Sequence, residues 1–302
     1  MSGSEENKTH ESGKNWYEKH YKKLLIVPAI LLIFSLVYLF QFSATHEDIV
    51  YKDVSLTGGT TITVFDSGVS PDEVTTALNE KFPDISVRGI SDIRTGKQQA
   101  FFVETASEAE EITSALEEFL GYELTSENSS TEFSGASLSS GFYQQLRLAI
   151  FIAFIFMAIV VFIIFRTTIP SLAVIVSALL DIVMTVVVLD LFKIPLSIGG
   201  IVALLMLIGY SVDTDILLTT RTIKKREGSL NKRMIGALTT GLTMTLTSII
   251  AIGVALIIIY NFSETLRQIF SILLIGLGFD LLNTWVTNAS LLRWYAERRA
   301  LS

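Results

Sequence analysis

The sequence contains no cysteine, so no disulfide supports any part of the fold and no thiol is available for catalysis. Histidine is almost as scarce, and none of His10, His20 and His46 has a second ligand at the spacing of a metal site. Serine and threonine are abundant, but no histidine lies near enough in sequence to suggest an activated nucleophile. We therefore expect no enzymatic activity, no bound metal and no cofactor.

Charged residues make up only 18% of the chain, and the basic ones are not interleaved with aromatic side chains as on nucleic-acid-binding surfaces. Nucleic acid is therefore not an expected partner. Hydrophobic residues, by contrast, make up 50% of the 302 residues. They gather in six runs, each long enough to cross a hydrocarbon core about 30 Å thick. The runs are residues 24–42, 146–165, 169–189, 196–218, 234–260 and 268–289.

The first run follows several lysines, as the apolar stretch of a signal peptide does. It is much longer than such a stretch, however, and no small-residue cleavage site follows it, so we interpret it as a retained membrane helix. Lysine and arginine gather before the first run, between the fourth and fifth runs, and after the sixth. The short loops on the other side carry only Lys193 and Arg267. The positive-inside rule then predicts a multi-pass protein of the cell membrane with both termini cytoplasmic.

The residues between the first two runs change from apolar to mixed and are expected to form a small α+β domain. Thr60–Phe65, Ile85–Ile90 and Ala100–Glu104 are expected as strands. Ser70 precedes one predicted helix, and Ser107 precedes a second that ends at Gly121. A last strand within 123–133 would complete a ferredoxin-like sandwich.

The expected fold class is therefore an α-helical membrane protein with six transmembrane helices and one ferredoxin-like α+β outer domain between helices 1 and 2. The expected divisions are a cytoplasmic tail (1–23), the first helix (24–42), an extracytoplasmic domain (43–145), a five-helix bundle (146–290) and a second cytoplasmic tail (291–302).

Four carboxyl groups lie inside the apolar runs. An ionised Asp near the centre of a membrane helix costs roughly 2.5 to 3.5 kcal/mol on insertion scales, so such residues mark ion paths, counter-charges or helix contacts. We interpret all four as candidate ion-relay residues: Asp181, Asp213, Asp215 and Asp280. Asp190, beside Lys193 at the edge of its run, is expected at the membrane interface and is excluded.

Asp213 and Asp215 are about 200° apart on a helix and cannot share a face. Asp213 lies on the face of Gly209, where a small residue allows a neighbouring helix to approach closely. We expect Asp213 to face the bundle interior and make it the first candidate for coupling. Asp215 shares its face with Ser211 and is placed so that it can also reach water near Arg221.

Asp280 heads a polar stripe that continues through Asn283, Thr284 and Asn288. For Asp181, Asp213 and Asp280, a simple interhelix hydrogen bond is the alternative to an ionic role. The fifth run carries a ladder of hydroxyls that either bond to their own helix backbone or solvate a neighbouring Asp. The ladder consists of Thr239, Thr240, Thr243, Thr245, Thr247 and Ser248.

Three passages resemble the SecF subunit of the SecD–SecF protein-export complex, a family related to the RND transporters. DVSLTGGT at 53–60 resembles the entry motif of the outer domain. ALLDIVMT at 178–185 places Asp181 on the family's Asp, with Leu180 in place of its His. IGYSVDTDILLTTR at 208–221 resembles the fourth-helix signature. The matching motif residues are Asp53, Gly58, Gly59, Gly209, Tyr210, Ser211 and Arg221.

The chain departs from the bacterial pattern in ways that look archaeal. Asp213 falls on the family's Asn and Thr214 on its Asp, so that Asp213-Thr-Asp215 is closer to the pattern of the partner SecD. The helix-five Arg of bacterial members is missing, and the bacterial pattern has no counterpart of Asp280. These differences leave open which carboxylate carries an ion.

The resemblance implies a non-enzymatic subunit that uses the transmembrane ion gradient, with a SecD-like partner, to promote polypeptide translocation. Its implied partners are SecD, the Sec translocation channel, unfolded polypeptides and the lipid bilayer. Half of an RND-like exporter of lipids or small molecules is the alternative, and a passive assembly factor is a third reading. Carboxylates with Ser and Thr suit either H⁺ or Na⁺, and that choice stays open.

Overall fold

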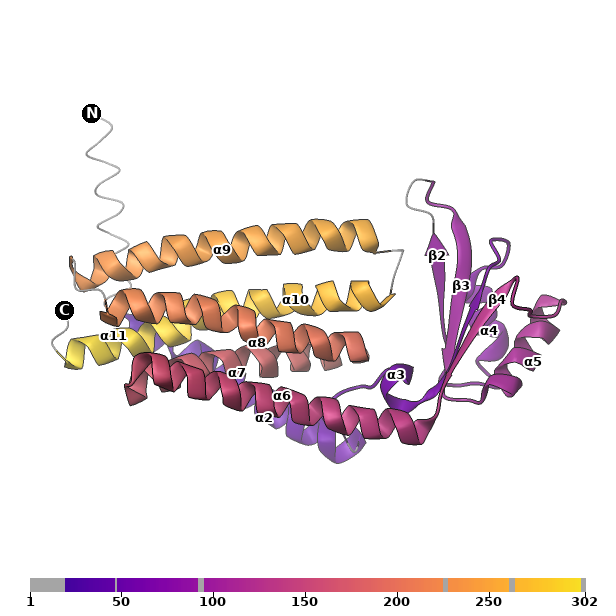
Figure 1. Cartoon of the computed structure of the whole chain (residues 1–302), viewed down its shortest axis with the longest axis horizontal. Helices are drawn as coiled ribbons and strands as arrows, with labels where there is room; N and C mark the ends of the chain where they lie inside the picture. Colours follow the sequence, from indigo (N-terminus) through magenta and orange to yellow (C-terminus); the bar gives the residue numbers. More distant parts are fainter. Residues whose placement is uncertain (1–19, 47, 92–94, 225–227, 261–263, 300–302) are drawn as a thin grey trace.

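The computed structural model describes residues 20–46, 48–91, 95–224, 228–260 and 264–299 (Figure 1). In this part of the chain, six helices are long and apolar enough to cross a membrane, as the six runs predicted. The remaining residues of the two expected tails lie outside it. The six helices are α2 (Ile26–His46), α6 (Ala136–Phe165), α7 (Thr168–Leu191), α8 (Ile198–Thr219), α9 (Leu230–Ile259) and α10 (Glu264–Leu282).

Two of these helices continue past the ends given above through wider π-helical turns. Helix α8 runs into η1 (Thr220–Lys224), and α10 runs through η2 (Asn283–Asn288) into α11 (Ala289–Arg298). The last helix therefore extends well beyond the apolar run that predicted it. Polar caps fix two of the helix starts, because the side chain of Ser197 accepts from the Gly200 N–H and that of Ser229 accepts from the Lys232 N–H.

Helices α7 and α8 form the inside of the bundle, whereas α2, α6 and α9 lie on its outside. In the most apolar stretch of each helix, 61% of α7 and 56% of α8 is buried, against 11% of α2 and 6% of α9. The outer helices expose large apolar side chains such as Ile33, Phe151 and Ile257. Helices that are apolar on their exposed faces are suited to contact with lipid, so polar groups are confined mainly to the inner helices.

The sheet domain (Gly59–Ser134) lies at one end of the bundle, and α11 lies at the other (Figure 1). Its strands are β1 (Gly59–Val64), β2 (Ser86–Ser91), β3 (Gln98–Thr105) and β4 (Ser129–Ser134), in the antiparallel order β2-β3-β1-β4. In register, Ile62 of β1 faces Val103 of β3 and Thr131 of β4. With α4 (Pro71–Leu78) and α5 (Ala109–Leu120), this is the expected ferredoxin-like βαββαβ arrangement.

The sheet domain has a hydrophobic core of its own. Alternate residues of β1, Ile62 and Val64, point inward and pack against Val74 of α4 and against Ile112 and Leu116 of α5. The cap expected at Ser107 was wrong by one residue, because Glu108 occupies the N-cap position. The Ser107 carbonyl instead accepts a hydrogen bond from the Thr60 hydroxyl at 2.7 Å. The core is separate from the bundle, as expected for a domain that folds as a unit.

The domain joins the bundle through a short helix, α3 (Val54–Thr57), and two glycines. Gly58 ends this helix with φ 86°, and Gly59 has φ 143°, a conformation open essentially to glycine alone. A Cβ on Gly59 would lie 2.2 Å from the backbone oxygen of Thr105. Gly58-Gly59 therefore serves tight backbone packing where the sheet domain leaves the bundle.

We predict that Gly59→Ala destabilises the sheet domain by about 3 kcal/mol or more. The alanine would carry about 1–3 kcal/mol of backbone strain, and its Cβ would also have to displace β3. The measurement is urea unfolding of the fragment 53–135. Gly121→Ala is the matched control, since Gly121 has φ 77° but no atom within 4 Å of the added carbon. Equal losses in the two variants would contradict the close approach at Gly59.

Candidate functional site

Three of the four predicted carboxyl groups meet inside the helical bundle. Asp181 of α7, Asp215 of α8 and Asp280 of α10 each have no exposed surface. The same three helices, with the continuation of α10, also carry most of the other buried polar side chains of the bundle. We call these three side chains the buried carboxyl cluster.

The carboxyl groups of Asp181 and Asp280 are surrounded by neutral donors. Asp181 accepts a hydrogen bond from the Ser211 hydroxyl at 2.5 Å and another from the Asn283 amide at 2.7 Å. Asp280 accepts from the Thr214 hydroxyl at 3.0 Å and from Thr284 at 3.2 Å. Both groups are therefore held in defined positions by partners on neighbouring turns and helices.

Asp215 is linked to Asp280 through a shared hydroxyl. Thr284 lies 2.8 Å from Asp215 and 3.2 Å from Asp280, and its single O–H can serve only one of them at a time. Asn288 donates its amide to the same Asp215 oxygen at 2.7 Å. Side-chain oxygens thus form a short path between two carboxyl groups, which is what a relay of protons or cations needs.

The π-helical turn η2 explains how Asn283 and Asn288 both reach the cluster. Residues five apart lie about 140° from each other on an α-helix, at 3.6 residues per turn. The i→i+5 bonding of a π-helix turns them toward one face, and such turns are frequent at functional sites. The expected stripe through Asp280, Asn283, Thr284 and Asn288 is therefore present and fully buried.

None of the three buried carboxyl groups makes a hydrogen bond or ion pair with Lys, Arg or His in the described part of the chain. Three negative charges at this depth would be strongly unfavourable without compensation. Neutral hydrogen-bond donors, protons or a cation would each lower this cost. In the same part of the chain, no three or more His, Cys, Asp or Glu side chains are grouped as metal ligands.

The expectation that Asp213 faces the interior of this bundle was wrong. Its side chain is exposed on the outer face of α8, together with Gly209 and Met206. Gly209 has no atom within 4 Å of an added Cβ, so no described helix of this chain packs there. The two-residue spacing correctly separated Asp213 from Asp215, but it is Asp215 that turns inward, not toward water.

The remaining motif residues of α8 connect it to its neighbours. Tyr210 hydrogen-bonds to the Ser248 hydroxyl and donates to the Met244 carbonyl at 3.2 Å, both on α9. Arg221 donates to the Gly236 carbonyl at 2.5 Å and to the Thr240 hydroxyl at 2.8 Å. Ser211 alone among the motif residues in the fourth helix reaches the carboxyl cluster.

The hydroxyl ladder of α9 mostly bonds to its own backbone. Thr243 donates to the Thr239 carbonyl and Thr247 to the Thr243 carbonyl, each at 2.8 Å. Thr239, Thr243 and Thr247 are exposed, whereas Thr245 is buried. This leaves a polar, exposed strip on α9 in the segment that is apolar enough to span a membrane.

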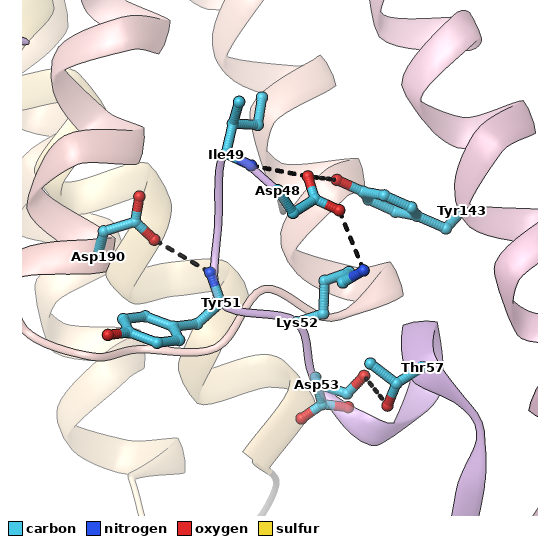
Figure 2. A network of polar contacts seen from close by, with 8 residues as sticks. All are labelled: Asp48, Ile49, Tyr51, Lys52, Asp53, Thr57, Tyr143 and Asp190. Carbon is cyan, nitrogen blue, oxygen red and sulfur yellow. Dashed lines mark hydrogen bonds and ion pairs between the residues drawn. The ribbon is translucent and has the colours of Figure 1, made fainter. Parts of the chain in front are cut away.

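The segment between α2 and the sheet domain forms a second polar network (Figure 2). This linker (residues 48–58) pairs with the loop between α7 and α8, since Leu196 accepts from the Asp53 N–H and donates to the Tyr51 carbonyl. Asp53 also caps α3 through the Ser55 N–H at 2.9 Å. Val50 and Leu56 pack into the bundle core, so the linker belongs structurally to the bundle.

Asp48 ties this linker to α6. It accepts from the Tyr143 hydroxyl at 2.8 Å and pairs with Lys52 at 3.0 Å (Figure 2). Burial raises the pKa of Asp48, but hydrogen bonds from the Ile49 backbone, Lys52 and Tyr143 outweigh burial and hold that pKa below its usual value. Asp190, expected only at an interface, is almost fully buried and accepts from the Tyr51 N–H at 3.2 Å.

Comparison with known proteins places these features in a family. Residues 115–298 match the family described as "Protein export membrane protein SecD/SecF, C-terminal". The chain is 38% identical to the protein-export membrane protein SecF of Methanothermobacter thermautotrophicus, over 93% of this chain and 95% of the relative. It is also 38% identical to SecF of Methanocaldococcus jannaschii, over 93% and 98%, and 34% identical to that of Pyrococcus furiosus, over 97% of each.

The fold is similar to that of a translocon-associated membrane protein, SecDF from Thermus thermophilus, with a TM-score of 0.70 at 17% identity. The match covers 93% of this chain but only 38% of that SecDF chain. A second SecDF crystal structure, in a super-membrane-facing form, has a TM-score of 0.52. The chain therefore has the fold of a part of SecDF.

We predict that Tyr143→Phe loosens the linker, because Asp48 loses one of the donors that keep it ionised. Since the pKa of Asp48 is lowered in the folded protein, its contribution to stability is present above the unfolded pKa of about 3.9 and is lost as pH falls through the folded value. The measurement is hydrogen-exchange protection of the Tyr51, Asp53 and Leu196 amides.

At pH 7 we expect several-fold lower protection of these amides in Tyr143→Phe than in the parent. Tyr122→Phe is the control, because it removes a similar hydroxyl bond, to Asp66 inside the sheet domain, at 2.6 Å. An unchanged linker in Tyr143→Phe would show that packing alone holds it.

Proposed function

The chain belongs to the SecD/SecF family of protein-export membrane proteins as a SecF, and from that premise we propose that it uses the transmembrane ion gradient to promote polypeptide translocation. It would do so together with a SecD partner at the Sec translocation channel. Its part is conformational, without catalysis: ion movement through the bundle changes the position of the sheet domain, which contacts the emerging unfolded polypeptide.

The observation that carries this proposal is the buried carboxyl cluster. Asp181, Asp215 and Asp280 are fully enclosed in a membrane-spanning bundle and have no basic partner there. A change in their occupancy by protons or cations changes the net charge of the bundle interior. One elementary charge crossing the membrane provides about 2.3 kcal/mol per 100 mV, enough to bias a domain motion that costs a few kcal/mol.

A SecD partner is supported by the exposed polar face of α8 and α9. Asp213, Thr239, Thr243 and Thr247 are exposed within segments that are apolar enough to cross a membrane. The threonine hydroxyls donate to their own helix backbone, but a carboxyl group facing lipid is costly, and contact with a partner helix would shield Asp213. Gly209, with open space above it, would let a partner helix approach closely. We therefore assign Asp213 to the contact with SecD and the buried cluster to coupling.

The proposed orientation places the sheet domain outside the cytoplasm and both termini inside. Basic side chains near the bundle end opposite the sheet domain support it, including Arg221, Lys224 and Arg293. The absence of native cysteine makes the orientation directly testable by labelling.

We predict that Glu118→Cys, exposed on α5, reacts with a membrane-impermeant maleimide added to intact cells. Lys232→Cys, exposed near the start of α9, should react only after permeabilisation. The cysteine-free parent controls for background labelling. The reverse pattern would invert the proposed topology.

We predict that Asp215→Asn reduces gradient-dependent stimulation of export to the level seen without a gradient, while the complex still assembles. The amide keeps the size and much of the hydrogen bonding of the carboxyl group but cannot titrate. The measurement is translocation into vesicles with and without an imposed gradient, and Asp72→Asn, exposed on α4, is the matched control.

Asp213→Asn tests whether Asp213 serves the contact with SecD or the coupling to the gradient. We expect it to weaken co-purification with SecD while retaining a gradient response in the complex that forms. If the gradient stimulated export fully in Asp215→Asn and not at all in Asp213→Asn, the coupling carboxyl group would be the one on the exposed face.

A further inference from the structure

The sheet domain is attached to the helical bundle at its two ends, and the two attachments differ in kind. At its C-terminal end, β4 is followed by Gly135 and then directly by α6, a continuous helix of 30 residues. At its N-terminal end, the attachment is the linker (residues 48–58), which is held by contacts with the bundle (Figure 2). The partners of the linker therefore decide which helices can displace this end of the sheet domain.

Tyr51 is the linker residue at which contacts with several elements meet. Its backbone N–H donates to the Asp190 carboxyl group, at the end of α7, at 3.2 Å (Figure 2). Its carbonyl accepts from the Leu196 N–H, in the loop between α7 and α8, at 2.7 Å. Its ring packs edge-on against Phe42 of α2, with 4.9 Å between the ring centroids. One residue thus joins the linker to α2, to α7 and to the loop.

Beyond Tyr51, the linker follows the same loop to the start of α8. The Asp53 N–H donates to the Leu196 carbonyl at 3.0 Å, and the Ile198 N–H donates to the Ser55 hydroxyl at 3.3 Å. Asp53 also caps α3, the helix that leads to β1. A displacement of Tyr51 is therefore passed to β1, because hydrogen bonds hold the segment between them.

Asp190 supplies the bond that reaches α7 itself, whereas the backbone bonds of the linker go to the loop after it. Asp190 is only 2% exposed, so water competes little for this bond. A hydrogen bond needs a donor–acceptor distance of about 3 Å, so the linker keeps this bond only by moving with the end of α7. The same helix carries Asp181 of the buried carboxyl cluster.

We propose that Asp190 is a positioning residue that transmits movement of α7 to the sheet domain through Tyr51. It acts as a hydrogen-bond acceptor, a role distinct from that of the buried carboxyl cluster. Because the other end of the domain is attached to α6, movement of α7 relative to α6 tilts the domain. The inference rests on the proposed function, since it names the contact through which movement of the bundle reaches the sheet domain.

The test compares Asp190→Ala with Asp190→Asn in the complex of the full chain with its SecD partner. Alanine removes the acceptor, whereas the asparagine amide still offers a carbonyl oxygen to the Tyr51 N–H. We expect faster hydrogen exchange of the Tyr51 amide and a several-fold loss of gradient-dependent stimulation of export in Asp190→Ala, and a nearly full response in Asp190→Asn. Asp66→Ala is the matched control and should keep the full response. It removes a carboxyl group that accepts a backbone N–H, that of Gly68 at 2.7 Å, inside the sheet domain.

A covalent replacement of the bond separates a positioning role from a general loss of stability. Lys52 and Leu196 pair as an isolated parallel bridge, and residues paired in this way lie about 5 Å apart, within the range that a disulfide spans. Because the chain has no cysteine, Lys52→Cys with Leu196→Cys gives one defined pair. Oxidation of this pair in Asp190→Ala should restore the gradient response, and reduction should remove it again. The same pair beside the native Asp190 should respond fully in both states.

The distance between the sheet domain and the bundle gives a readout that does not depend on export. Spin labels on Glu118→Cys of α5 and Phe192→Cys at the end of α7 report this distance, and both positions are exposed. Pulsed electron spin resonance should show a narrow distance distribution in the parent and in Asp190→Asn. The distribution should be broader in Asp190→Ala, because the linker no longer moves with α7.

A full gradient response in Asp190→Ala, equal losses in Asp190→Asn and Asp190→Ala, or a loss that the oxidised cysteine pair does not restore would each overturn the positioning role. A parent complex that shows no stimulation by a gradient would reject the proposed function instead. In that case the distance distribution decides on the positioning role, which stands if Asp190→Ala broadens the distribution and falls if it does not.

Discussion

A carboxyl group enclosed by membrane-spanning helices has to be neutralised, hydrogen-bonded or matched by a cation, and this requirement organises the interior of the bundle. Asp181, Asp215 and Asp280 have no surface exposure, so their partners must come from the protein. Those partners are hydroxyls and amides, supplied by α8 and the η2 turn. Helices α2, α6 and α9, which are little buried within this chain, lie outside and separate this interior from lipid.

The same arrangement connects the interior to the sheet domain. The sheet domain has its own core, so it is able to move as a unit. It is attached through the linker at 48–58, which packs on α7 and the loop that follows it, and through β4, which leads into α6. Helix α7 therefore carries Asp181 near its middle and Asp190, which holds the Tyr51 amide, near its end. A shift of α7 would reach the linker directly.

Much of the fold follows from local sequence properties. Six long apolar runs predicted six helices. Alternating strand patterns with glycine and serine signals predicted the βαββαβ domain, because strands and helices each have a fixed residue period. Helix ends were less accurate. The last helix continues to Arg298 through a π-helical turn. The Asn and Thr side chains of this turn donate hydrogen bonds to buried carboxyl groups, and a hydropathy pattern does not predict such bonds.

The sequence by itself determined that Asp213 and Asp215 occupy opposite faces, because that depends only on residues per turn. Which face turns inward was decided by packing. The π-helical turn η2 covers the face with Asp215, whereas Asp213 is exposed among the described residues. The contact between Asp48 and Tyr143 is 95 residues apart in sequence and has no local signal. The same holds for the contacts of Thr284 and Asn288 with Asp215, since α8 and η2 are far apart in sequence and must pack before these side chains meet.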